Sequence, residues 1–419
     1  MADYQPATMS RSAHKIFIGY LLCGLLLACD SGGPENTAES DAITGGESGP
    51  IALGAEEIDI VARISAAYFR RIDSDFNAAG IALEAFAGEV ESFLADPDEP
   101  GLTRVRKAWI NASVAYELTN LHRYFASSVL IDSQSLNLFQ LDYQISHWPI
   151  LPGYIDYVSN YPDSGMVNDM TVALEPDNLR AQHGAFDINE AALGLHVIEY
   201  LLWGENNGEG TLRPASDFRA QTSLTTQQIN DGLSIENLSS NRRREFLSLL
   251  TALLLEDFAN LVSTWSEGSS RLRVAEPEDA AQSLQHLLTA MTGFMRDEVL
   301  TRSLYLMLNG EFAESRPSIF SDTSQNMVSA QLTAMELLLL EIGQSGGGNM
   351  DQLLSGLSAD YEEFFLQNFD ASKECLVVLY SEASQESMSD SEIEFKVVEC
   401  INALTNMIDY LERIGTNQA

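Results

Sequence analysis

The sequence predicts an all-α protein that folds as two helical-bundle domains in one compact body. Almost every long segment after residue 55 repeats apolar residues at three- and four-residue steps, the period of an amphipathic helix. Alternating apolar and polar residues, which are typical of strands, are scarce. With 419 residues the chain exceeds one typical domain, and its 45% hydrophobic residues are ordinary for globular cores.

Helical periodicity gives the order of the elements. The expected helices cover residues 58–72, 79–94, 102–125, 191–203, 242–265, 280–307, 326–342, 350–368, 374–384 and 393–414. Prolines and a glycine in the region 131–182 preclude a long continuous helix there, and the polar stretch 204–228 contains Pro214. We place a boundary in that stretch, between an N-terminal helical domain (55–215) and a C-terminal one (216–419).

The N-terminus resembles a bacterial lipoprotein signal peptide. Arg11 and Lys15 precede a short apolar run over 16–27, which is too short to span a bilayer as a stable helix. The run ends in Leu-Leu-Ala followed by Cys29, which resembles a lipobox. We therefore expect residues 1–28 to be removed and Cys29 to be lipidated. Residues 29–54 then form a flexible acidic tether to the membrane of a bacterial cell envelope.

The charge of the chain excludes one class of partner. Lysine and arginine number 23 against 61 aspartates and glutamates, which gives a formal net charge of −38. Nucleic-acid binding needs a basic surface, so we expect no nucleic-acid partner.

Two cysteines remain after the signal peptide and Cys29 are set aside. Cys375 and Cys400 lie nearly symmetrically about the polar stretch 381–391, which joins two helical patterns. Residues placed in this way face each other in an antiparallel helix pair. We predict a disulfide, which contributes on the order of 3 kcal/mol by loop closure; two buried free thiols are the alternative.

The segment 194–204 carries the strongest candidate for a binding site. His196 and Glu199 are three residues apart in an apolar stretch, so they share one face of a helix. A buried glutamate is costly without a hydrogen-bond partner, a metal ion or water. A core histidine that is hydrogen-bonded to Glu199 in a purely structural role is the alternative.

Other carboxylates could converge on His196. Glu117, Asp156 and Asp322 lie in apolar or irregular segments. One histidine with two or more carboxylates favours iron, manganese or zinc. The simpler alternative is that each is a surface or capping residue, with Ser321 or Asp322 capping the next helix.

Four blocks of sequence together resemble the imelysin family. Gly-x-His-x-x-Glu at 194–199 runs into Tyr-Leu-Leu-Trp-Gly at 200–204, as in that family's signature. Further resemblances are Trp109 with Tyr116-Glu117, Trp148-Pro149 with Tyr154-Ile155-Asp156, and Ser318-Ile319-Phe320-Ser321-Asp322. The chain departs from the family pattern at Ser113 and Asn120, and at Thr323, Ser324 and Gln325.

The resemblance implies an all-helical, two-domain envelope protein that is associated with bacterial iron acquisition and classed among the metallopeptidases. Carried onto this sequence, it implies metal ligands at His196, Glu199 and Glu117. Asp156, Ser321, Asp322 and Trp203 are then expected to surround the ligand. The expected cofactor is a divalent or ferric metal ion, either iron or zinc.

Two functions follow from these expectations. The first is a lipid-anchored binding protein that works with iron-uptake components. The second is a metal-dependent peptidase. Catalytic zinc usually has three protein ligands and an open position, and the sequence offers two ligands firmly, so we favour binding.

Overall fold

The protein is predominantly helical in the part of the chain that the computed structural model describes, namely residues 51–205, 212–274, 279–342, 348–381 and 388–416. Within these ranges the only β-type pairing is an isolated bridge between Val158 and Tyr161, which confirms the all-α class. The predicted signal peptide, Cys29 and most of the tether lie outside the described residues.

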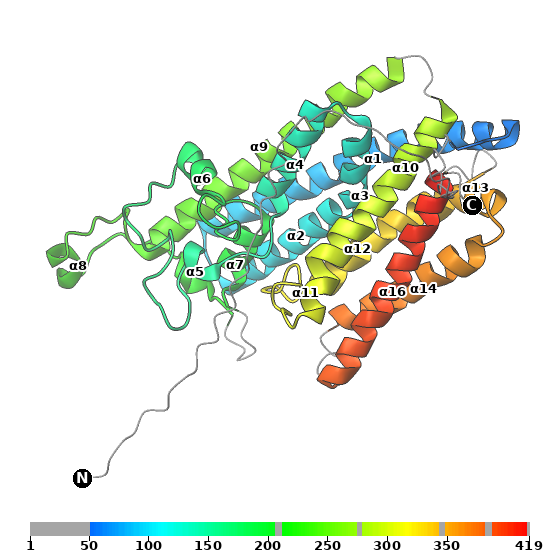
Figure 1. Cartoon of the computed structure of the whole chain (residues 1–419). Helices are drawn as coiled ribbons and strands as arrows, with labels where there is room; N and C mark the ends of the chain where they lie inside the picture. The colour runs from blue at the N-terminus through cyan, green and yellow to red at the C-terminus, as the bar shows by residue number, and fades with distance from the viewer. Residues whose placement is uncertain (1–50, 206–211, 275–278, 343–347, 382–387, 417–419) are drawn as a thin grey trace, which may run out of the picture. The chain divides into compact units, whose positions relative to one another are not determined.

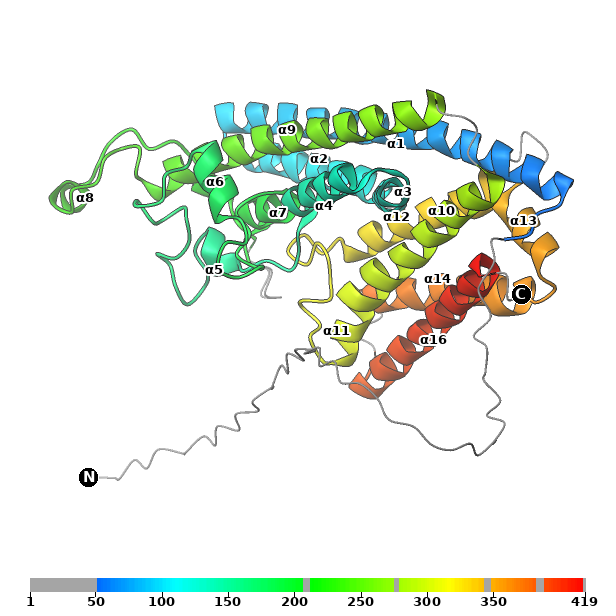
Figure 2. The ribbon, with the colours of Figure 1, turned by 45° about the horizontal axis from the view of Figure 1, so that its top comes forward.

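The first group of helices packs side by side around a shared core. It comprises α1 (Ala55–Ala95), α2 (Glu99–Glu117), α3 (Asn120–Val129), α4 (Asp132–Ser146) and α9 (Ser239–Val274). Helix α1 packs on α2 and α9, and α4 packs on α9 (Figures 1 and 2). Their shared core contains fully buried aromatic side chains, among them Phe76, Trp109 and Trp265.

Two predicted helix boundaries in this group are wrong. The polar residues between 72 and 79 do not interrupt α1, because Asp75 is buried and its Oδ2 lies 2.8 Å from His122 Nε2 and 2.6 Å from Arg71 Nε. The predicted helix 102–125 instead divides at residues 118–119 into α2 and α3. The region 131–182, expected to be irregular, begins with α4, which ends before the first proline.

The second group of helices follows α9. It comprises α10 (Ala280–Gly293), the π-helical η2 (Phe294–Leu304), α11 (Tyr305–Leu308), α12 (Ser324–Glu336), η3 (Leu337–Glu341), α13 (Met350–Leu357), η5 (Glu362–Leu366), α14 (Gln367–Tyr380) and α16 (Asp390–Gly415). Helix α14 packs against α16, and α10 packs on both α3 and α16. Met350–Leu357 ends well before the predicted residue 368, and α14 begins earlier than predicted.

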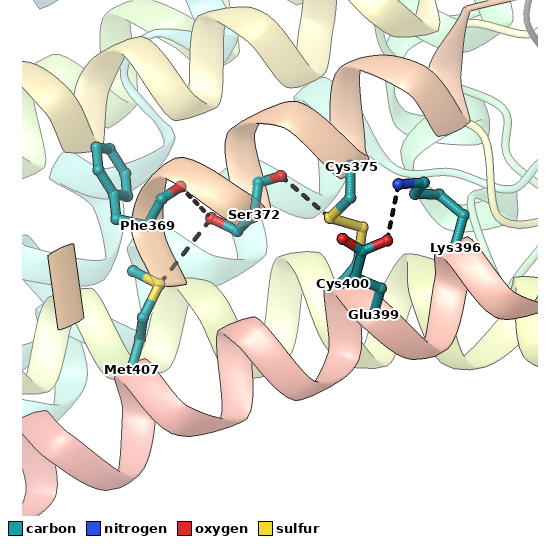
Figure 3. Close-up of a disulfide and its surroundings, with 7 residues drawn as sticks. All are labelled: Phe369, Ser372, Cys375, Lys396, Glu399, Cys400 and Met407. Carbon is teal, nitrogen blue, oxygen red and sulfur yellow. Dashed lines mark hydrogen bonds and ion pairs between the residues drawn. A yellow bond between two sulfur atoms is a disulfide. The ribbon is translucent and has the colours of Figure 1, made fainter. Parts of the chain in front are cut away.

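A disulfide joins α14 to α16, as predicted. Cys375 and Cys400 have Cα atoms 5.8 Å apart, and both residues are buried between the two helices (Figure 3). One turn away, Ser372 Oγ lies 2.8 Å from the carbonyl oxygen of Phe369 and 4.0 Å from Met407 Sδ on α16, so it has a polar contact on each helix of the pair (Figure 3).

The predicted division into two domains is not confirmed. Residues 48–419 form one compact unit. Helix α9, which follows the predicted boundary, packs on α1, α4 and α7 from the preceding half.

The part of α9 from Ser239 to Ser270 is the one described helix whose length and apolar composition would allow it to cross a membrane. Half of its most apolar window is buried inside the fold, as is usual for a core helix of a globular protein.

A region of short helices and loops lies between α4 and α9. It contains α5 (Pro152–Ile155), α6 (Pro176–Gln182), α7 (Leu195–Trp203), η1 (Ala215–Phe218) and α8 (Thr226–Asn230). Arg242, at the start of α9, holds the loop before α6 against α9. Its guanidinium donates to the carbonyl oxygens of Met166, Val167, Asp169 and Val172. These bonds hold the loop region beside α7.

Candidate functional site

Helix α7 is short and buried along its whole length. All nine of its residues are buried, and it begins after Gly194 and ends before Gly204. Gly194 has a φ of 97°, and a Cβ there would lie 2.6 Å from the carbonyl oxygens of Gln144 and Ile145. Glycine therefore lets the backbone approach α4 closely and start the helix that carries His196.

His196 and Glu199 form a buried pair on one face of α7, as the spacing predicts. His196 Nδ1 lies 3.1 Å from Glu199 Oε2, and the Glu199 side chain is fully buried. A carboxylate only accepts hydrogen bonds, so Nδ1 carries a proton, and in the neutral imidazole Nε2 presents a lone pair. Among the described residues Nε2 has no hydrogen-bond partner.

Ser321 holds the other oxygen of Glu199. The backbone N–H and the hydroxyl of Ser321 donate to Glu199 Oε1 at 2.7 and 2.8 Å. Thr323 Oγ1 lies 2.7 Å from the same hydroxyl. The carboxylate is therefore fixed from both sides, by α7 and by the loop before α12, and it orients the imidazole of His196.

The loop that supplies Ser321 has an unusual backbone. Ser318 and Asp322 have φ values of 58° and 55°, in the left-handed region that non-glycine residues seldom adopt. Asp322 Oδ1 lies 3.6 Å from Arg316 Nη2. Neither Ser321 nor Asp322 caps α12, whose N-cap position is Thr323 and has no side-chain cap. Such backbone strain is common at functional sites.

A cavity of about 240 Å³ opens beside this pair. Its walls come from the segment before α5, the loop before α12 and helix α7. The lining residues are Trp148, Pro149, Ile150, Leu151, Pro152, His196, Glu199, Ala313, Glu314, Arg316, Ser318, Ile319 and Phe320. The cavity is mostly apolar, with His196, Glu199, Arg316 and Ser318 among its few polar residues.

Glu117 lies in a separate polar cluster. Its carboxylate accepts from Gln331 Nε2 at 2.7 Å and from Ser146 Oγ at 3.3 Å. Glu117 does not line the cavity, and no set of three or more histidine, cysteine, aspartate or glutamate side chains in the described ranges could hold a metal ion. The structure thus does not bring Glu117 together with His196 and Glu199.

Asp156 follows α5 and Trp203 is the last residue of α7, and neither residue lines the cavity. Asp156 is fully buried and accepts from Arg243 Nε at 2.6 Å and from Arg213 Nη1 at 2.9 Å. The ring of Trp203 lies 5.2 Å from that of Trp109, and the Arg106 guanidinium lies 5.5 Å from the Trp203 ring. The structure therefore does not place either residue against a ligand in this cavity.

Sequence reasoning missed a second cavity next to the first. It measures about 370 Å³ and shares Trp148 and Pro149 with the first cavity. It is lined in addition by His147 and Arg302. Burial, with Arg302 next in importance, lowers the pKa of His147 to about 3, so this imidazole is neutral. The prolines after Trp148 indicated an irregular segment here, but no sequence pattern predicted that it lies next to Arg302.

A buried histidine network in the first helix group was also missed. His122 Nδ1 lies 3.0 Å from the Tyr68 hydroxyl, and His122 Nε2 lies 2.8 Å from Asp75 Oδ2. Burial lowers the pKa of His122 below its usual value. Tyr68, Asp75 and His122 line neither of the two cavities described above, so we interpret the network as structural. The polar interruption in α1 was the only sequence signal for it.

These features define an all-helical protein with a glycine-initiated helix whose buried histidine and glutamate face a small apolar cavity. The chain belongs to the imelysin family: the family described as imelysin, peptidase M75, matches residues 72–411. No curated protein sequence shows significant similarity to the chain.

Two solved structures are similar to this one. A Parabacteroides distasonis protein described as an iron-regulated protein A precursor is 12% identical, with a TM-score of 0.53, over 90% of this chain and 97% of that one. An imelysin-like protein from Psychrobacter arcticum is 13% identical, with a TM-score of 0.47, over 86% of this chain and 95% of that one. At this identity the first likeness supports the fold alone.

Proposed function

We propose that this protein is a lipid-anchored cell-envelope protein of bacterial iron acquisition. In this proposal it binds a metal ion or an iron-containing ligand at His196 and Glu199. Membership of the imelysin family supports an iron-related role, as does the iron-regulated description of the Parabacteroides distasonis protein. The lipobox-like sequence ending in Cys29 supports the anchor.

The observation that carries the proposal is the orientation of His196. Its Nδ1 contacts Glu199, and Ser321 in turn fixes Glu199, so Nε2 is left beside the cavity with a lone pair that could coordinate a metal ion. Carboxylates commonly hold metal-binding imidazoles in this way, and they raise the basicity of the coordinating nitrogen. A purely structural pair would not need an adjoining cavity.

The donor set fits a metal only in part. Both oxygens of Glu199 are engaged by His196 and Ser321, and Glu117 lies elsewhere. His196 Nε2 is thus the one ligand that this arrangement offers directly. A metal bound there would act as an electrophile, and it would need other ligands from the molecule that carries it.

The alternative function is that of a metal-dependent peptidase, which the family description favours. Catalytic zinc usually takes three protein ligands and an open position. The described residues do not assemble three such ligands, so we place peptidase activity second.

Metal titration of the purified protein tests the proposal. We expect iron or zinc to bind to the wild type, and binding to be lost in the double variant His196→Ala/Glu199→Ala. His286→Ala, which changes a histidine on α10 outside the cavity, is the matched control. Unchanged metal binding in the double variant would exclude this site. Peptide cleavage that disappears in the same variant would favour the peptidase instead.

Membrane partition tests the anchor. We expect the full-length protein to be found in the membrane fraction, and Cys29→Ser to release it from that fraction. An unchanged distribution of the variant would argue against lipidation at Cys29. If the wild type is found in the membrane fraction, cross-linking of this membrane-bound protein would identify its iron-uptake partners.

A further inference from the structure

The walls of the cavity at His196 offer much more apolar surface than a bare metal ion can use. One wall is the segment from Trp148 to Pro152, and the opposite side includes Ala313, Ile319 and Phe320. A hydrated cation gains nothing from such surfaces. An apolar body gains about 25 cal/mol for each Å² that it buries. The ligand that fits these walls therefore carries a sizeable apolar part.

The polar groups that line the cavity favour a ligand that carries a hydroxyl and an acid group. His196 Nε2 offers a lone pair to a donor, and the Ser318 hydroxyl is buried without a hydrogen-bond partner in the structure. A buried polar group without a partner costs about 1–3 kcal/mol, which a ligand hydroxyl would recover. Arg316, which pairs with Asp322 at 3.6 Å, brings positive charge to the same cavity, whereas Glu314 brings negative charge to it. An acid group of the ligand therefore has to lie on the side of Arg316.

The size of the cavity limits the apolar part of the ligand that it can enclose to about one ring. Engineered cavities of about 150 Å³ bind benzene. The volume here, about 240 Å³, leaves room for a benzene ring with a few polar substituents, and it is too small for a large macrocycle.

We propose, on the basis of the proposed function, that the cavity binds the hydroxylated aromatic ring of an acidic phenolic or catecholic iron chelator. The ring lies among the side chains of Trp148, Phe320 and their apolar neighbours. A ring hydroxyl that is not coordinated to the iron keeps its proton, donates to His196 Nε2 and meets the Ser318 hydroxyl, and the acid group lies toward Arg316. The other oxygens of the chelator, in their deprotonated form, hold the iron, so the protein need not supply three ligands.

Calorimetric titration with a small panel of ligands tests this proposal. The probes are 2,3-dihydroxybenzoate, its ferric complex, benzoate, and Zn²⁺ or Fe²⁺ alone under anaerobic conditions. We expect dihydroxybenzoate, free or ferric, to bind at least about tenfold more tightly than benzoate, since one good polar contact contributes about 1.4 kcal/mol. Trp148 fluorescence should change on binding, and Trp148→Phe should abolish that signal.

Two variants and a control localise the binding. His196→Gln and Ser318→Ala should each weaken dihydroxybenzoate binding about tenfold while leaving benzoate binding nearly unchanged. His286→Gln should change neither affinity. Because Ser318→Ala removes only a hydroxyl, it keeps the test valid if His196→Gln is poorly folded.

The outcomes separate this inference from the proposed function. Binding of Zn²⁺ or Fe²⁺ that depends on His196, without binding of dihydroxybenzoate, would overturn the inference and leave the proposed function standing. Binding of the free ring with exclusion of its ferric complex would support the ring site and contradict the role in iron acquisition. Binding of neither the ring nor a metal would overturn both.

Discussion

The substitution Glu199→Gln isolates the role of the buried carboxylate. Glutamine has nearly the same shape, so its amide oxygen can still accept from the N–H and hydroxyl of Ser321 at the position of Oε1. Its amide nitrogen then faces His196 Nδ1, where the carboxylate oxygen lies at 3.1 Å in the wild type. An amide N–H donates, so Nδ1 must become the acceptor and the proton moves to Nε2.

The change of tautomer removes the lone pair that the ligand needs. Loss of a group that orients a metal-binding imidazole typically costs about 10- to 100-fold in affinity, and we expect a loss of that size for ligand binding to Glu199→Gln. The free energy of unfolding should fall by only about 1–3 kcal/mol, because charge-assisted hydrogen bonds become neutral ones while a buried charge is removed.

Three measurements check this prediction. Long-range ¹H–¹⁵N correlation spectra at neutral pH report which nitrogen of His196 carries the proton, calorimetry gives the affinity, and urea unfolding gives the stability. Glu117→Gln is the matched control, since it neutralises a buried carboxylate that accepts from Gln331 outside the cavity. If Glu199→Gln kept the wild-type tautomer and affinity, the reasoning about Glu199 would be refuted.

Three further predictions concern stability. Replacing Cys375 and Cys400 by serine should lower the free energy of unfolding by about 3–4 kcal/mol, and two thiols titrating in the denatured, unreduced wild type would contradict the disulfide. Asp156→Ala should cost about 3–5 kcal/mol in urea unfolding, because it removes the buried carboxylate that Arg213 and Arg243 share and leaves Arg213 with Asp217 alone, at 3.3 Å; a loss below about 1 kcal/mol would show that these charges are not desolvated. Burial lowers the pKa of His147 to about 3 and of His183 to about 4, so the unfolded chain takes up protons first as the pH falls. The free energy of unfolding should therefore keep its full contribution from these two histidines above about pH 6.5 and fall below that pH, by about 2 kcal/mol for each histidine at pH 5. His147→Gln should remove roughly half of that loss, and an unchanged dependence of the free energy of unfolding on pH would contradict this prediction.

Local patterns predicted the elements well, because helical periodicity and symmetric cysteines depend on residues near in sequence. The disulfide between α14 and α16 followed from the positions of Cys375 and Cys400 about a short polar connection. The continuity of α1 did not follow from its own sequence. It depends on His122, which is 47 residues away from Asp75 and pairs with it in the core.

The candidate site was predictable only in part for a similar reason. The spacing of His196 and Glu199 predicted their pairing, which the structure shows at 3.1 Å. The link from Glu199 to Ser321 spans 122 residues, and no periodicity encodes it. Glu117 was expected beside His196 from resemblance, but it lies in a cluster with Gln331.

The location of bound iron is the sharpest test of binding at His196. Crystals exposed to a ferric phenolic chelate, and separately to Fe²⁺ under anaerobic conditions, would be measured at the iron absorption edge. We expect one anomalous peak at coordinating distance from His196 Nε2, or next to the aromatic ring that Nε2 holds. A peak at Glu117 or in the cavity of His147, with the cavity at His196 empty, would contradict it.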